Sequence, residues 1–123
     1  MILIDTSALI DSLCGPRRSG QTLRSFIEGG ERIEVPTLVV YEWLRGPRLP
    51  EEVDAQEALF PINRAIAFGA PEAALAARLY RSLARPRGRE IDLAIAACAL
   101  EHGARLWTLN RGDFQDIPDL ELL

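Results

Sequence analysis

Short apolar segments alternate with helical segments along the whole chain, and this alternation restricts the possible folds more than any other feature. Predicted strands cover residues 2–4, 33–35, 64–68, 105–109 and 120–123. Predicted helices cover residues 8–13, 19–28, 37–45, 51–60, 71–84 and 90–101, and Gly or Pro follows most of them. Strands that alternate with helices require crossover connections, so the pattern predicts a parallel sheet with helices on both faces. We expect one α/β domain over residues 1–123.

The composition excludes several classes of chemistry. All 14 basic residues are Arg, and without Lys the chain has neither the phosphate-loop Lys of an NTPase nor a Schiff-base amine. Cys14, Cys98 and His102 are the only Cys and His residues, too few for a usual zinc site. The net charge of −4 disfavours a general nucleic-acid coat protein but is compatible with a nuclease. With no basic leader and no long apolar run, we expect a cytoplasmic protein.

Polar residues follow two of the predicted strands directly. Asp5 comes after residues 2–4, while Asn110 and Asp113 come after residues 105–109. Ligand sites of parallel sheets lie beyond the carboxyl ends of the strands, which places these residues where such a site is expected. A purely structural role is also open for each of them, because Asp5 is a suitable helix N-cap and Asn110 to Asp113 is a good turn sequence.

Two further acids lie in apolar helices. Glu42 has Val39, Val40 and other apolar neighbours, and an acid in such a helix costs several kcal/mol unless it is compensated. Arg45, three residues later, is one possible partner for Glu42. Asp92 stands in the first turn of the helix over residues 90–101, where simple pairing with the helix dipole is the alternative role.

Taken together, these residues predict a site for a hard cation. Carboxylates gathered in one pocket repel one another unless a cation neutralises them, and oxygen ligands select Mg²⁺ or Mn²⁺. Such a metal in a pocket without Cys or His indicates phosphoryl chemistry. Arg87 and Arg89 precede Asp92 closely and are candidates for contacts with a phosphate.

Four motifs in order resemble those of PIN-domain ribonucleases, in particular the VapC-like toxins of toxin–antitoxin pairs. These motifs are Met-Ile-Leu-Ile-Asp-Thr-Ser at residues 1–7, Val-Val-Tyr-Glu-Trp-Leu-Arg-Gly at 39–46, Asp-Leu-Ala-Ile-Ala-Ala at 92–97 and Trp-Thr-Leu-Asn-Arg-Gly-Asp-Phe at 107–114. The resemblance implies a three-layer α/β/α fold with a parallel sheet of roughly five strands. It also implies a Mg²⁺- or Mn²⁺-dependent endoribonuclease that forms a homodimer and is inhibited by an antitoxin protein.

The resemblance also implies roles for individual residues. Asp5, Glu42 and Asp92 would be the core catalytic acids and metal ligands, with Asp113 or Asn110 as the fourth ligand. Many relatives have Asp where this chain has Asn110, and an amide oxygen brings no charge. Thr6 and Thr108 would orient the carboxylates through hydrogen bonds.

Two functions other than that of a nuclease are compatible with parts of the sequence. The Asn110 departure favours a PIN-like module that binds RNA or protein without cleavage. A phosphatase or phosphoacceptor with Asp5 as its nucleophile is disfavoured because such domains use a Lys. A homodimer is also expected from an apparent excess of apolar residues in the helices over residues 8–13 and 19–28.

Overall fold

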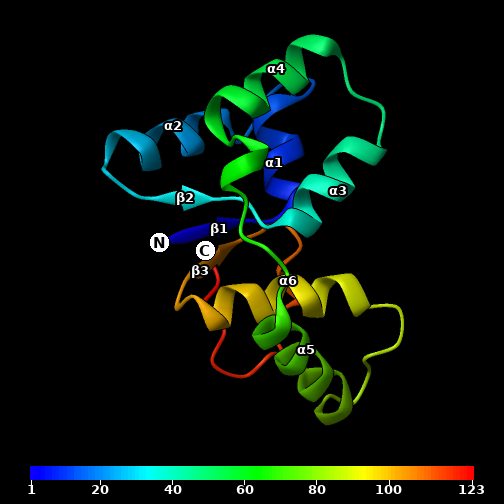
Figure 1. Cartoon of the computed structure of the whole chain (residues 1–123). Helices are drawn as coiled ribbons and strands as arrows, with labels where there is room; N and C mark the ends of the chain where they lie inside the picture. The colour runs from blue at the N-terminus through cyan, green and yellow to red at the C-terminus, as the bar shows by residue number, and fades with distance from the viewer.

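A parallel sheet forms the centre of the computed structural model, which describes residues 1–123 (Figure 1). Its strands are β1 (Ile2–Ile4), β2 (Ile33–Glu34) and β3 (Arg105–Trp107), in the order β2-β1-β3. Ile2 pairs with Ile33 on one side and with Arg105 on the other. All three residues of β1 are buried, as expected for a central strand covered on both faces. The predicted parallel α/β fold is confirmed.

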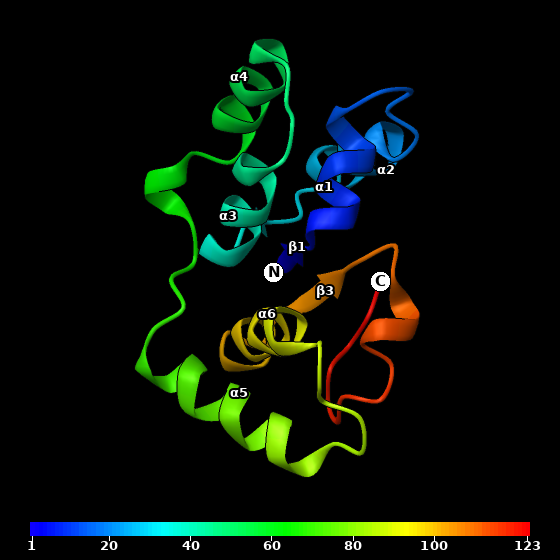
Figure 2. The same ribbon diagram turned by 90° about the vertical axis from the view of Figure 1, so that its right-hand side faces the viewer.

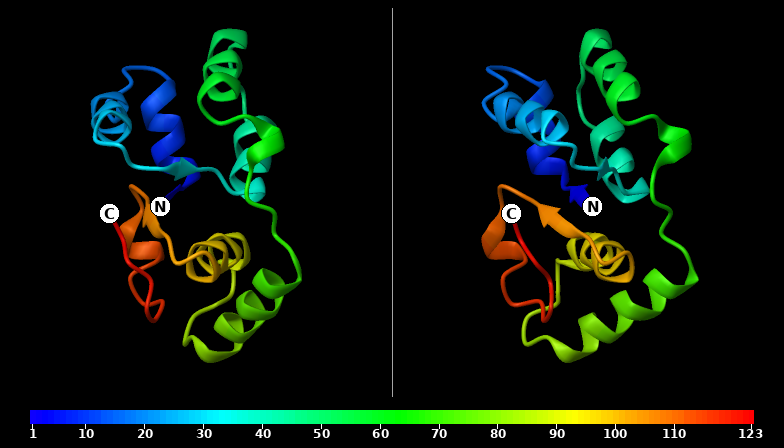
Figure 3. Two further views of the ribbon diagram at one scale, coloured as in Figure 1. Left: turned by 60° about the vertical axis from the view of Figure 1, so that its left-hand side comes forward. Right: turned by 90° about the vertical axis from the view of Figure 1, so that its left-hand side faces the viewer.

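Single bridges extend the sheet at both edges. Ile66 forms a parallel bridge with Pro36, and Leu122 forms one with Leu106 as the C-terminal segment returns to the sheet beside β3 (Figure 3). Five extended segments therefore lie side by side, but only three of them are strands. The expected strand over residues 64–68 is reduced to one bridge because Arg64 still belongs to a 3₁₀ turn, η1 (Ile62–Arg64).

Helices cover the two faces of the sheet unequally. The helices α1 (Thr6–Leu13), α2 (Gly20–Glu28), α3 (Thr37–Arg45) and α4 (Pro50–Leu59) lie on one side. The helices α5 (Ala70–Ser82) and α6 (Glu90–Glu101) lie on the other, with α5 outside α6 (Figures 1 and 2). Residues 93–99 of α6 are all buried because this helix is apolar around its whole circumference and packs between the sheet and α5. A second 3₁₀ turn, η2 (Arg111–Asp113), follows β3.

The apolar residues of α1 and α2 are mostly used inside the monomer. Leu9, Leu13 and Leu23 are buried, and the ring of Phe26 packs edge-on against Trp107 at 5.1 Å between centroids. Ile27 is the one large apolar side chain of these helices that is exposed. The expectation that these helices have more apolar residues than the monomer can bury was therefore wrong, because the sheet and the neighbouring helices cover most of these side chains. The homodimer stays a prediction. None of the helices is both long and apolar enough to cross a membrane.

Candidate metal-binding active site

Asp5 is a buried carboxylate held by two hydroxyl groups. It occupies the N-cap position of α1, yet its side chain makes no capping hydrogen bond. Instead, Oδ2 of Asp5 accepts hydrogen bonds from Thr108 Oγ1 at 2.8 Å and from Ser7 Oγ at 2.9 Å. Thr108 reaches Asp5 because β1 and β3 are neighbouring parallel strands that end at the same edge of the sheet. Helix capping therefore does not account for this side chain.

Ser7 is a site residue that was not predicted from the sequence. Its hydroxyl lies 3.3 Å from Thr108 Oγ1 and accepts a hydrogen bond from the Leu109 N–H at 3.0 Å. The Asn110 N–H donates to Thr108 Oγ1 at 3.0 Å, so the same network orders the chain after β3. The only signal in the sequence is the position of Ser7, two residues after Asp5 at the end of a strand.

Glu42 connects α3 to this network. Thr6 Oγ1 donates to Glu42 Oε1 at 2.6 Å, while Arg45 Nη2 lies 3.4 Å from Glu42 Oε2. Arg45 is thus a partner of Glu42, but it is not the only one. Because Thr6 directly follows Asp5, its hydrogen bond places Glu42 on the side of the site where Asp5 lies.

The helix that carries Glu42 is less buried than its apolar sequence predicted. Val39, Val40 and Trp43 are buried, but Tyr41 and Leu44 are 55% and 45% exposed. The helix packs through one stripe only, because residues spaced three and four apart share a face. The Glu42 side chain is 20% exposed and borders this stripe rather than lying in the core.

Asp92 is electrostatically coupled to the other acids. Its pKa is raised from 3.8 to about 6, first by partial burial and then by the negative charges of Asp5, Asp113 and Glu42 in that order, while Arg89 lowers it. The helix dipole favours an anion in the first turn of α6, so dipole pairing cannot explain a pKa that rises. Asp5, Glu42, Asp92 and Asp113, the acidic cluster, share one electrostatic environment.

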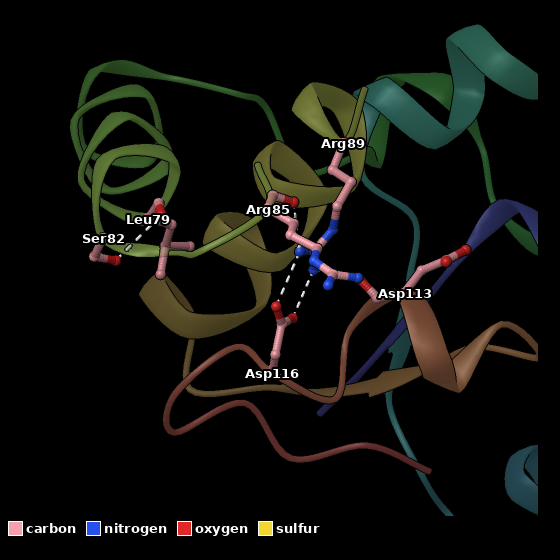
Figure 4. A network of polar contacts seen from close by, with 6 residues as sticks. All are labelled: Leu79, Ser82, Arg85, Arg89, Asp113 and Asp116. Carbon is pink, nitrogen blue, oxygen red and sulfur yellow. Dashed lines mark hydrogen bonds and ion pairs between the residues drawn. The ribbon is translucent and has the colours of Figure 1, made fainter. Parts of the chain in front are cut away.

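The two candidates for the fourth ligand lie in and next to η2. Asn110 caps this turn, and the Asp113 N–H donates to the Asn110 carbonyl at 3.0 Å, but neither side chain makes a capping hydrogen bond. Both residues are exposed. Figure 4 shows the Asp113 carboxylate pointing away from the Arg89 guanidinium. Turn chemistry thus explains the backbone here and leaves both side chains free.

Arg87 and Arg89, the two candidates for contacts with a phosphate, differ in whether their side chains are free to bind one. Arg87 is exposed, whereas Arg89 makes a two-point ion pair with Asp116 at 2.6 and 2.9 Å (Figure 4). Only Arg87 is therefore free to meet a phosphate. Asp116 was not predicted as a partner of Arg89, because a separation of 27 residues gives no local signal.

The acidic cluster offers only oxygen donors, and these are the ligands that a hard cation prefers. As the side chains stand, no three Asp, Glu, His or Cys residues are close enough to enclose a metal ion. The cluster nevertheless combines four carboxylates, of which only Glu42 has an Arg partner, Arg45, at 3.4 Å, while the nearby Arg89 is paired with Asp116 outside the cluster. A divalent cation would supply the missing positive charge, and the carboxylates would have to draw together around it.

The fold places this chain among the α/β proteins with a parallel sheet, and its acidic cluster lies beyond the carboxyl ends of the strands, where ligand sites of such sheets are found. Within that class the family is clear. The chain belongs to the PIN domain family, whose model matches residues 2–120.

Individual relatives cover nearly the whole chain. It is 36% identical over 124 aligned positions to Ribonuclease VapC19 of Mycobacterium tuberculosis, with 98% of each chain covered. A toxin-antitoxin complex from Klebsiella pneumoniae has 25% identity and a TM-score of 0.77, with 100% of this chain and 96% of that chain covered. DNA-bound VapBC from Salmonella typhimurium shares the fold, with a TM-score of 0.80, 21% identity and coverage of 99% and 96%.

Proposed function

We propose that this protein is a divalent-metal-dependent endoribonuclease that hydrolyses RNA phosphodiester bonds. The observation that carries the proposal is the electrostatic coupling of four carboxylates, one directly after β1 and the others in α3, α6 and η2, in one acidic cluster. The likeness to a relative named as a ribonuclease supports the choice of RNA. Bound Mg²⁺ or Mn²⁺ would supply Lewis-acid activation of a water and of the phosphodiester.

Each residue of the proposed active site would have a separate role in binding the metal or the RNA. Asp5, Glu42 and Asp92 would hold the cation, with Asp113 or Asn110 completing the set. Thr108 and Ser7 would keep the Asp5 carboxylate in one orientation, and Thr6 would do the same for Glu42. Arg87, which is exposed, would bind a phosphate of the RNA away from the scissile bond.

The direct test is RNA cleavage by the purified wild-type protein under controlled metal supply. We expect cleavage with Mg²⁺ or Mn²⁺, none with excess EDTA, and full recovery when the metal is restored. Cleavage that persists in EDTA would contradict the metal requirement. RNA binding without cleavage at any metal concentration would instead favour a PIN-like binding module, the alternative that Asn110 supports because an amide adds no charge to the site.

The fourth ligand can be identified by comparing two variants. If Asp113 provides it, Asp113→Asn is expected to weaken Mn²⁺ binding about tenfold, while Asn110→Ala has the smaller effect, because a carboxylate offsets cation charge and an amide supplies only a dipole. Calorimetric Mn²⁺ titration measures both affinities, and thermal melts detect any loss of stability. The opposite ranking would assign the fourth ligand to Asn110.

We further propose that the protein is the toxin of a toxin–antitoxin pair, acts in the cytoplasm on RNA and forms a homodimer. The resemblance of its fold to a chain in a toxin-antitoxin complex from Klebsiella pneumoniae supports an antitoxin partner. Tyr41 and Leu44 of α3 and Phe68 before α5 provide exposed apolar surface for a second copy.

A further inference from the structure

Arg89 connects three segments of the chain next to the acidic cluster. Its backbone belongs to the start of α6, because its carbonyl accepts the Leu93 N–H at 2.9 Å. Its side chain reaches back to the Arg85 carbonyl at 3.0 Å and across to the Asp113 carbonyl at 2.8 Å (Figure 4). Asp116 takes one hydrogen bond from each terminal nitrogen.

These contacts use up the two terminal nitrogens of Arg89. Each of them makes two hydrogen bonds, and Nε is buried without a partner. The side chain is 19% exposed and its one unpaired donor, Nε, is buried, so no donor of Arg89 is available to a substrate. The Asp116 carboxylate also offsets the positive charge of Arg89, which would otherwise repel a cation bound close by.

Arg89 holds a turn that is also fixed at its two ends. At its start the Asn110 N–H donates to Thr108 Oγ1 at 3.0 Å. No residue of η2 is buried, whereas Phe114 and Ile117 just after it are anchored in the core. The hydrogen bond from Arg89 to the Asp113 carbonyl joins η2 to the start of α6. Asp92 is three residues after Arg89, about one helical turn further along the same element.

We propose that Arg89 and Asp116 form a positioning pair that holds η2 against the start of α6, so that the Asp113 and Asp92 carboxylates face one cation. The pair contacts neither substrate nor metal and acts through the placement of Asp113. This inference rests on the proposed metal site, and it makes the affinity for the cation depend on an ion pair outside the acidic cluster.

The test uses Mn²⁺ alone, titrated calorimetrically into the full-length metal-free protein. Asp116→Ala is expected to bind Mn²⁺ about tenfold more weakly than wild type, a usual effect for the loss of a residue that orients metal ligands. Asp116→Glu, which retains the carboxylate, is expected to recover most of the affinity. The control is Glu31→Ala, which breaks the 2.7 Å ion pair with Arg105 at the opposite end of the strands and should leave Mn²⁺ affinity unchanged.

A second background separates positioning from simple loss of charge. In Asp113→Asn protein, Asp116→Ala should cause no further loss, because the ligand that it positions is already gone. An equal loss in both backgrounds would overturn the proposal, as would unchanged affinity in Asp116→Ala or no Mn²⁺ binding by wild type. RNA cleavage is measured separately, so a protein that binds Mn²⁺ normally but cleaves no RNA refutes the proposed function and not the positioning pair.

Discussion

Asp5→Asn is expected to lower RNA cleavage about a thousandfold, a loss of about 4 kcal/mol of transition-state stabilisation, while the fold stays intact. The substitution removes one negative charge from the proposed metal site. It keeps an oxygen that can accept the hydrogen bonds now made by Thr108 and Ser7. Folding should hold because removing one carboxylate from a repulsive cluster relieves repulsion.

Cleavage rates and thermal melts of Asp5→Asn test this expectation together. The matched control is Glu31→Gln, which makes the same change from acid to amide just before β2, at the amino ends of the strands. We expect the control to cleave RNA at the wild-type rate. An Asp5→Asn protein that unfolds would make Asp5 a structural residue, and one that cleaves normally would remove it from the active site.

Asp92→Asn is expected to stabilise the metal-free protein by about 2 kcal/mol at about pH 8 and to have no such effect near pH 4. In the folded protein the pKa of Asp92 is about 6, above its ordinary value of 3.8. The folded state therefore binds this proton more tightly than the unfolded state does. Ionisation above about pH 6 destabilises the fold, and protonation removes that penalty as the pH falls towards 4.

Urea unfolding in EDTA at several pH values measures the difference between variant and wild type. Glu90→Gln is the control, because Glu90 lies in the same first turn of α6 but is exposed to solvent. It should destabilise the protein by a few tenths of a kcal/mol through the lost dipole interaction. If Asp92→Asn were also destabilising at about pH 8, Asp92 would be an ordinary helix-dipole partner. Saturating Mn²⁺ should reduce the difference in unfolding free energy between Asp92→Asn and wild type, because the cation stabilises the wild-type protein more than the variant.

Local sequence was sufficient to predict most of the helices and strands. Helix-forming composition, capping residues and Gly or Pro breaks predicted all six helices, and the short β-branched run at residues 2–4 predicted the central strand. Asp5 could be placed at a carboxyl end from the sequence alone, since it directly follows that strand. Edge strands were harder to predict, because strand extent depends on a pairing partner: residues 64–68 contribute only the bridge at Ile66.

What the sequence by itself determined is the order of helices and strands and the residue types that reach the sheet edge, because both follow from patterns within a few neighbouring residues. The tertiary structure alone decided which of these groups meet. Thr108 is 103 residues from Asp5, and Asp116 is 27 residues from Arg89, yet each pair is joined by hydrogen bonds. Such contacts, and the raised pKa of Asp92, arise from charge and burial contributed by distant segments, which no local pattern encodes.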